Sequence, residues 1–202
     1  MQLPRAVVPL AVVCTLSFLT LAAVARAQYF FPLDYTVQEL AQGARHPLLE
    51  SLMRAVTLLG TGWVLAPLSA LGWLGLRRLG HPLARFVPAA VVGAFLLGAL
   101  TKWLVARPRP RGTQYGFPSG HALGAAVFFG AVVYVLWTLD VPRVRRWIAT
   151  VLMCLLVLGV SWSRLYLRAH WLSDVLGGLV GGVAYLTVAL IVIDRRLRSP
   201  PT

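Results

Sequence analysis

Long apolar segments separated by short polar connections run through the chain from end to end. An α-helix needs about 20 apolar residues to cross the hydrocarbon core of a bilayer. Six segments reach or approach this length: Val7–Ala25, Ala55–Leu76, Phe86–Val105, Ala122–Thr138, Trp147–Trp162 and Val175–Ile193. The fourth and fifth are somewhat short, and we expect them to extend into their flanks. The pattern predicts an all-α polytopic membrane protein, with six transmembrane helices in one bundle and a single domain over residues 1–202.

The connection Arg26–Arg54 is the longest between two of these segments. It is amphipathic and could lie at the membrane interface, because it begins with a cluster of aromatic residues: Tyr29, Phe30, Phe31 and Tyr35. The first segment also resembles a signal peptide, since Arg5 precedes an apolar core that ends in the small-residue sequence AVARA. This core is longer than that of a usual signal peptide, so we expect the segment to be retained as a helix.

Composition agrees with a membrane protein. The chain is 58% hydrophobic and 12% charged, whereas soluble domains contain about 25% charged residues. Its net charge of +13 would suggest nucleic acid in a soluble protein. Here the basic residues lie in short connections, where they orient the chain, meet anionic headgroups or bind an anionic substrate. No nucleic acid and no obligatory protein partner are expected, and the two cysteines, Cys14 and Cys154, form no motif.

Polar and ionisable residues gather in the third and fifth connections, which share one side of a six-span protein. The third contains KWLVARPRPRG and FPSGHA, and the fifth contains SRLYLRAHWLSD. Eight residues of these stretches can therefore meet at one bilayer surface: Lys102, Arg109, Ser119, Gly120, His121, Arg164, His170 and Asp174.

The cations and the start of the fourth segment suit a phosphate group. Lys102 offers a point charge, while Arg109 and Arg164 offer planar forks that pair with phosphate oxygens. Ser119 and Gly120 lie at the start of a helix, where backbone N–H groups are free and glycine allows close approach. We therefore expect these five residues to bind a phosphoryl group.

Two histidines and an aspartate add the reactive groups. His170 and Asp174 are spaced i, i+4, so on a helical turn they share a face. The aspartate can accept from one imidazole nitrogen and leave the other free to attack phosphorus. His121 can then protonate the leaving oxygen. Such a set supports phosphoryl transfer through a phosphohistidine, and it needs no metal ion or other cofactor because the cations supply the electrostatic stabilisation.

The same stretches resemble the three signature motifs of the type 2 phosphatidic acid phosphatase (PAP2) superfamily. The motifs are K-x6-R-P from Lys102 to Pro110, P-S-G-H from Pro118 to His121, and S-R-x5-H-x3-D from Ser163 to Asp174. The motif core thus covers residues 102–174. The resemblance implies a metal-independent membrane phosphatase with His170 as nucleophile, Asp174 as its orienter, His121 as acid, and the remaining motif residues around the phosphoryl group.

Several other residues have less specific interpretations. We expect Arg107, Arg111 and Arg168 to meet lipid headgroups or substrate charge, and His46 and His81 to be ordinary connection residues. The acidic residues are scattered and no H-x-H or H-E-x-x-H motif occurs, so no metal site is predicted. Overlapping G-x-x-x-G spacings in the last segment favour close helix packing, within the bundle rather than between two copies, at Gly177, Gly178, Gly181 and Gly182.

The orientation of the chain follows from its cations. The side that holds both chain ends carries ten lysines and arginines, and the other side carries nine. Setting aside Lys102, Arg109 and Arg164, which have a chemical reason to be there, the comparison becomes ten against six. We therefore expect both termini in the cytoplasm and the candidate site at the outer face of a bacterial-type cytoplasmic membrane.

The predicted activity is hydrolysis of a membrane lipid phosphate or diphosphate, and the best substrate prediction is an isoprenoid diphosphate of the undecaprenyl type. Alternatives are a phosphatidic acid or phosphatidylglycerophosphate phosphatase, or a lipid-to-lipid phosphotransferase with the same phosphoenzyme. A non-catalytic lipid-phosphate binder or transporter is a further alternative. It would need only the cations, so the intact His121, His170 and Asp174 argue against it.

Overall fold

The computed structural model describes residues 3–4, 6–112 and 115–198, so Arg5 lies outside the described part. The regular secondary structure of these ranges is α-helical, with turns and loops between the helices. Its α-helices are α1 (Val7–Arg26), α2 (Pro32–Gly43), α3 (Pro47–Leu58), α4 (Gly62–Arg78), α5 (Phe86–Val105), α6 (Gly120–Thr138), α7 (Arg143–Tyr166) and α8 (Leu172–Arg198).

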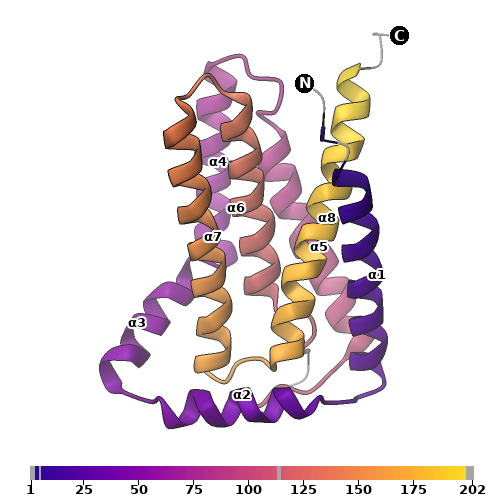
Figure 1. Ribbon diagram of the computed structural model, residues 1–202, viewed down its shortest axis with the longest axis vertical. Helices are drawn as coiled ribbons and strands as arrows, with labels where there is room; N and C mark the ends of the chain where they lie inside the picture. The colour runs from indigo at the N-terminus through magenta and orange to yellow at the C-terminus, as the bar shows by residue number, and fades with distance from the viewer. Residues whose placement is uncertain (1–2, 5, 113–114, 199–202) are drawn as a thin grey trace.

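The long helices run side by side and form one bundle (Figure 1). Among the described residues, α1, α5, α6, α7 and α8 are each long and apolar enough to cross a membrane. Helices α3 and α4 pass the same test only as a pair bent by 45°, so the candidate spans number five, or six if this pair is one span. The short helix α2 lies across one end of the bundle, together with the α5–α6 and α7–α8 connections, and both termini lie at the other end (Figure 1). The predicted all-α membrane fold is therefore confirmed, and the third and fifth connections share one end.

The second predicted span, Ala55–Leu76, is wrong as a continuous helix. The chain breaks between Leu58, where α3 ends, and Gly62, where α4 begins. At the break, a side chain on Gly60 would come within 2.6 Å of Val160 Cγ1 and 3.0 Å of His121 Cβ. The backbone can approach α6 and α7 this closely because Gly60 has no side chain. The bend thus lets α3 lean out while α4 packs in the bundle.

Helix α7 is longer than its apolar segment, as expected for the short spans. It begins at Arg143 and continues to Tyr166, four residues beyond the predicted end at Trp162. Arg164 is therefore held on the last turn of a helix instead of in a flexible connection. The α5–α6 connection does leave the helix, because Pro108 and Pro110 lack the N–H groups that a further turn would need.

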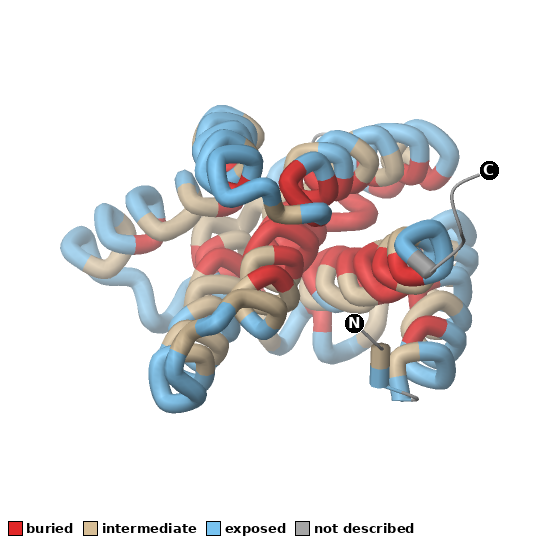
Figure 2. The backbone as a smooth tube through the Cα atoms, turned by 90° about the horizontal axis from the view of Figure 1, so that it is seen from above, coloured by how far each residue is buried: buried red, intermediate tan, exposed pale blue. Residues whose placement is uncertain are grey.

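Helix α6 forms the centre of the bundle, and the most buried backbone is gathered there (Figure 2). The last helix approaches it through glycines: a side chain on Gly178 would meet the Ser119 carbonyl at 2.6 Å, and one on Gly182 would meet Ala126 Cβ at 2.8 Å. The other two glycines of this group face Phe117 and Phe18. All four therefore pack inside the bundle, as predicted, and two of them, Gly178 and Gly182, let α8 lie close against α6.

Candidate active site

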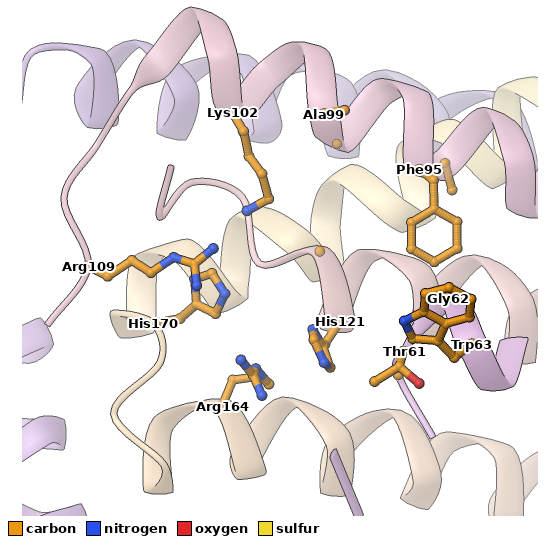
Figure 3. A pocket seen from close by; sticks show the side chains of 14 residues that line it. Thr61, Gly62, Trp63, Phe95, Ala99, Lys102, Arg109, His121, Arg164 and His170 are labelled. Atoms are coloured by element: carbon orange, nitrogen blue, oxygen red, sulfur yellow. The ribbon is translucent and has the colours of Figure 1, made fainter. Parts of the chain in front are cut away.

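A cavity of about 450 Å³ lies between the start of α4, the second half of α5, the start of α6 and the end of α7. Six of the eight predicted site residues line it, namely Lys102, Arg109, Gly120, His121, Arg164 and His170. They come from the end of α5, the α5–α6 connection, the start of α6, the end of α7 and the α7–α8 connection. Figure 3 shows the three cationic side chains pointing toward the two imidazoles. Residues some seventy positions apart in the chain thus form one pocket.

The three cations are held in place by neutral oxygen atoms. Lys102 Nζ donates to the carbonyls of Tyr115 (3.0 Å) and Pro118, and a terminal nitrogen of Arg109 lies 3.4 Å from the Tyr115 carbonyl. Arg164 donates to Thr57 Oγ1 of α3 at 2.7 Å. Within the described part of the chain, none of the three forms an ion pair with an acidic side chain. Their positive charge therefore remains available to an anion in the cavity.

His170 lies in the connection just before α8, and Asp174 lies in the first turn of that helix. The two predicted partners lie near each other without sharing a helical turn: His170 Nδ1 is 3.5 Å from Asp174 Oδ2, which is longer than the usual N–H···O distance, and Nδ1 has no hydrogen-bond partner among the described residues. Both side chains are buried, and Nδ1 is turned away from solvent. Since His170 also lines the cavity, its Nε2 is the nitrogen left for a ligand.

The ionisation of His170 suits a nucleophile. Burial is the main cause that lowers the pKa of His170 from 6.5 to about 4, and the nearby cations Lys102 and Arg164 act in the same direction. Asp174, whose carboxylate lies 3.5 Å from the imidazole, acts in the opposite direction and raises the pKa. The imidazole is therefore neutral at physiological pH, with a lone pair on one nitrogen.

The P-S-G-H stretch forms the N-terminus of α6. Gly120 and His121 line the cavity, and His121 faces His170 across it (Figure 3). Ser119 is the N-cap: its hydroxyl accepts the Ala122 N–H at 3.5 Å, and its own N–H donates to the Asp174 carbonyl. Ser119 is fully buried behind the lining. Its observed contacts join α6 to α8, and phosphate contact by Ser119 stays a prediction.

The expectation that Arg107 meets lipid headgroups or substrate charge is wrong, because the residue is buried and does not line the cavity. Its side chain is only 1% exposed and donates to Asp174 Oδ1 at 3.0 Å. It also lies 3.4 Å from Asp34 Oδ2, and its guanidinium stacks on the Phe30 ring, 4.3 Å from the centroid. A buried arginine needs acidic partners and hydrogen bonds to offset its desolvation, and this one has two carboxylates.

The sequence interpretation missed Asp34 and Gln38 of α2 as well. Asp34 is buried against the start of α8, and the Gln38 amide donates to the His170 carbonyl at 2.8 Å. One signal was available: the chain has only six acidic residues. With so few acidic residues and many arginines in the chain, an ion pair between Asp34 and one of the arginines could have been predicted.

The two remaining histidines, His46 and His81, lie outside the cavity lining. His46 is the N-cap of α3, where its Nδ1 accepts the Leu48 N–H, and His81 Nδ1 accepts the Leu83 N–H in the α4–α5 connection. These local roles fit ordinary connection histidines. Among the described residues, no three His, Cys, Asp or Glu side chains come together in a group that could hold a metal ion. Whether the reaction proceeds without metal stays a prediction.

Comparisons with known proteins agree with the geometry. The model of the PAP2 superfamily matches residues 83–198, more than half of the chain. The chain is 28% identical to phosphatidylglycerophosphatase B of Bacillus subtilis, over 83% of this chain and 87% of that protein. It is 31% identical to the undecaprenyl-diphosphatase of Sulfolobus acidocaldarius, over 70% of each protein.

A solved structure shows the same fold over nearly the whole chain. It is the transmembrane PAP2-type phosphatidylglycerolphosphate phosphatase from Bacillus subtilis, which aligns with a TM-score of 0.84 and 25% identity. The alignment covers 94% of this chain and 98% of that one. The motifs, the cavity that joins them, the family match and the shared fold lead to one conclusion: this chain belongs to the PAP2 superfamily and is an integral membrane phosphatase of that type.

Proposed function

We propose that this phosphatase hydrolyses a membrane lipid diphosphate through a covalent phosphohistidine on His170. The observation that carries the proposal is the convergence on a neutral, buried histidine of three cations that form no ion pair with an acidic side chain in the described part of the chain. A phosphoryl group bound by Lys102, Arg109 and Arg164 lies within reach of His170 Nε2. The cations offset the negative charge that otherwise repels a nucleophile, and they stabilise the charge that develops in the transition state.

The reaction runs in two steps. His170 Nε2 forms a bond to phosphorus while the bond from phosphorus to the leaving oxygen breaks, and His121 gives that oxygen its proton. Asp174 stabilises the positive charge that His170 gains. Water then attacks the phosphohistidine, with His121 as its base, and inorganic phosphate and His170 are released. Because the cations supply the electrostatic stabilisation, the reaction needs no metal ion.

An isoprenoid diphosphate of the undecaprenyl type is the best substrate candidate. A diphosphate carries more negative charge than a phosphate monoester, and three uncompensated cations suit it. The cavity continues from the cations to an apolar side lined by Trp63 at the start of α4 and by Phe95 and Ala99 of α5 (Figure 3). The first units of a lipid tail fit this side, so the substrate reaches the site laterally from the bilayer. The Sulfolobus acidocaldarius relative is named an undecaprenyl-diphosphatase.

A phosphatidylglycerophosphate phosphatase is the second candidate, because the relative and the solved structure that cover most of the chain carry that name. Phosphatidic acid offers the same monoester chemistry. A phosphotransferase would use the same phosphohistidine and differ only in the acceptor. Water and a lipid hydroxyl then compete for one intermediate.

The proposed orientation has the active site outside and both termini in the cytoplasm. The burial of Arg107 strengthens the charge argument, because this residue too has a structural reason to lie at the α2 end. When Arg107 and the three cavity cations are left out of the count of lysines and arginines, ten remain on the side with the termini and five on the side of α2. Excess lysine and arginine marks the cytoplasmic side.

Phosphate release from purified lipids tests the function. The panel contains undecaprenyl diphosphate, undecaprenyl phosphate, phosphatidylglycerophosphate and phosphatidic acid, each with and without EDTA. The highest kcat/KM is expected for the diphosphate, with full activity in EDTA. His170→Ala should lose at least about 10³-fold in kcat, whereas His81→Ala in the α4–α5 connection should match wild type.

Each other outcome points to a different mechanism or function. Undiminished release by His170→Ala contradicts the nucleophile assignment, and loss in EDTA that Mg²⁺ restores contradicts the metal-free mechanism. A ranking led by phosphatidylglycerophosphate selects the second candidate. Labelled phosphate recovered on an added lipid acceptor identifies a phosphotransferase, and binding without any turnover identifies a non-catalytic binder.

A further inference from the structure

Helix α2 lies outside residues 83–198, which the family model matches. Buried polar contacts nevertheless bind it to the catalytic loop, by which we mean residues 167–174, from the end of α7 to the first turn of α8. Two of its residues point into the protein, Asp34 at 1% exposure and Gln38 at 5%. Side chains of this kind are rarely buried without a partner that requires them. Both partners lie next to His170.

Asp34 caps the start of α8 from another helix. Its Oδ1 accepts the Ser173 backbone N–H at 2.7 Å, and its Oδ2 accepts the Ser173 hydroxyl at 2.8 Å. A carboxylate at a helix N-terminus is stabilised by the free N–H groups and by the helix dipole. Because Asp174 is the next residue after Ser173, Asp34 fixes the turn of α8 that carries it.

Arg107 joins the two carboxylates. One terminal nitrogen contacts Asp174 Oδ1 at 3.0 Å and Ser173 Oγ at 2.7 Å, and the other contacts Asp34 Oδ2 at 3.4 Å and the Tyr29 carbonyl at 2.8 Å. One buried cation thus serves two buried anions. A pair of Arg107 and Asp174 alone would be neutral, but with Asp34 the cluster carries one net negative charge beside His170. This charge favours the cationic imidazole that forms during attack on phosphorus.

Gln38 holds the backbone of the nucleophile itself. Its amide nitrogen donates to the His170 carbonyl at 2.8 Å, one helical turn after Asp34. The two contacts hold the loop at His170 itself and at Ser173, the residue before Asp174. A shift of this loop would move Nε2 relative to the bound phosphorus, and attack is sensitive to such a displacement.

We propose that Asp34, Gln38 and Arg107 are positioning residues for phosphoryl transfer, through which α2 holds the His170–Asp174 pair in its reactive geometry. The proposal rests on the phosphohistidine mechanism given above. It adds that an interfacial helix outside the matched region sets the rate of the chemical step, without touching the substrate.

The test compares Asp34→Asn with Glu39→Gln. Both variants change a carboxylate of α2 to an amide, but Glu39 is exposed. The rate constant of phosphoenzyme formation is measured in a single turnover with a labelled lipid phosphate, because this constant does not depend on the fraction of folded protein. Asp34→Asn should lower this constant and kcat about tenfold or more, with KM within about threefold of wild type. Glu39→Gln should stay within about twofold of wild type in all three quantities.

Gln38→Met provides a second test that keeps the charge of the cluster and the size of the side chain. It should lower the phosphorylation rate constant about three- to tenfold at unchanged KM. If Asp34→Asn does not fold, this variant alone tests whether α2 positions the His170–Asp174 pair. Rate constants equal to wild type in the folded variants overturn the positioning role, and so does a loss that appears only in KM. If the wild-type protein forms no phosphohistidine, the proposed function has failed; if only the variants behave as wild type, the positioning role alone has failed.

Discussion

At the scale of single residues, the protonation state of His170 decides whether this nucleophile can attack. Burial lowers its pKa to about 4. The imidazole is therefore neutral above that pH and becomes protonated only as the pH falls through about 4. A protonated imidazole has no lone pair to offer, so the acid loss of nucleophile activity should lie well below 6.5.

A titration of ¹⁵N-labelled histidine in the ligand-free protein measures this directly. We expect the His170 signals to remain those of a neutral ring down to about pH 5, and the signals should disappear in His170→Ala. Titration of His170 near pH 6.5 would contradict the lowered pKa that we attribute to its burial and to the nearby cations.

His121 has a separate role that depends on the leaving group. As the acid that protonates the departing oxygen, it should contribute about 10²- to 10⁴-fold to the rate for a lipid alcohol. In a single turnover, the rate constant of phosphoenzyme formation should therefore fall by this factor in His121→Asn with a lipid phosphate monoester, but much less with an aryl phosphate, whose leaving oxygen needs no proton. Equal falls of this rate constant with both substrates would contradict the role of His121 as the acid.

Much of the candidate site could be predicted at this scale, because the motif residues reveal their chemistry by type and spacing. Arg107 could not be assigned in this way, since its partner Asp34 lies 73 positions away in the chain. A lone arginine near a membrane has two physical solutions, a lipid headgroup or a buried carboxylate, and only the fold selects between them. For Ser119, the sequence indicated a helix N-terminus correctly but could not show that the Asp174 carbonyl takes its N–H.

At the scale of elements, the break between α3 and α4 brings the backbone at Gly60 close to His121 in the active site. An alanine at Gly60 would place its Cβ 2.6 Å from Val160 and 3.0 Å from His121 Cβ. Val160 is buried and stiff, so the backbone at the break must move relative to α7 and to the start of α6. We expect Gly60→Ala to lower kcat about tenfold by displacing His121, as measured by phosphate release per folded enzyme.

Gly72→Ala is the matched control for this change. Gly72 lies inside α4, and a side chain there meets nothing within 4 Å. The same substitution should leave kcat unchanged and keep or raise the thermal midpoint, because alanine favours a helix over glycine. If Gly60→Ala retains wild-type activity, the close approach of the break to His121 has no functional consequence.

The hydrophobic pattern predicted five of the six spans well but could not predict this break. Apolar residues continue through Leu58 and Leu59 into Trp63 and Val64, so the stretch has the composition of one helix. The bend depends on the contact of Gly60 with α6 and α7, which sequence spacing does not contain. Helix α7 extended at both ends for a different reason: its polar ends, at Arg143 and Arg164, lie beyond the apolar stretch that signals a span.

At the scale of the whole molecule, the six-span fold was predictable because the bilayer permits few solutions. Backbone groups in hydrocarbon must be satisfied inside their own segment, so long apolar segments become helices. Their alternation then brings the third and fifth connections to one end, as Figure 1 shows. The identity of the lipid was not predictable in the same way, since it depends on how the faces of α4 and α5 shape the apolar side of the cavity.

Cysteine labelling tests the orientation of the whole bundle. Cys14 and Cys154 are first replaced by alanine, and one reporter is added: Gly43→Cys at the α2 end, or Asp140→Cys at the end with the termini. A membrane-impermeant maleimide applied to intact cells should label the first reporter and not the second. Labelling of the second reporter alone would invert the proposed orientation and place the site in the cytoplasm.

Capture of the covalent intermediate tests the central claim most directly. The purified enzyme is mixed with a lipid substrate labelled in the transferred phosphate, quenched in alkali, where phosphohistidine survives, and mapped by mass spectrometry. The account predicts labelled phosphate on the peptide that contains His170, formed as fast as turnover and missing in His170→Ala. Steady turnover with no labelled peptide, or with phosphate on another residue, would contradict it.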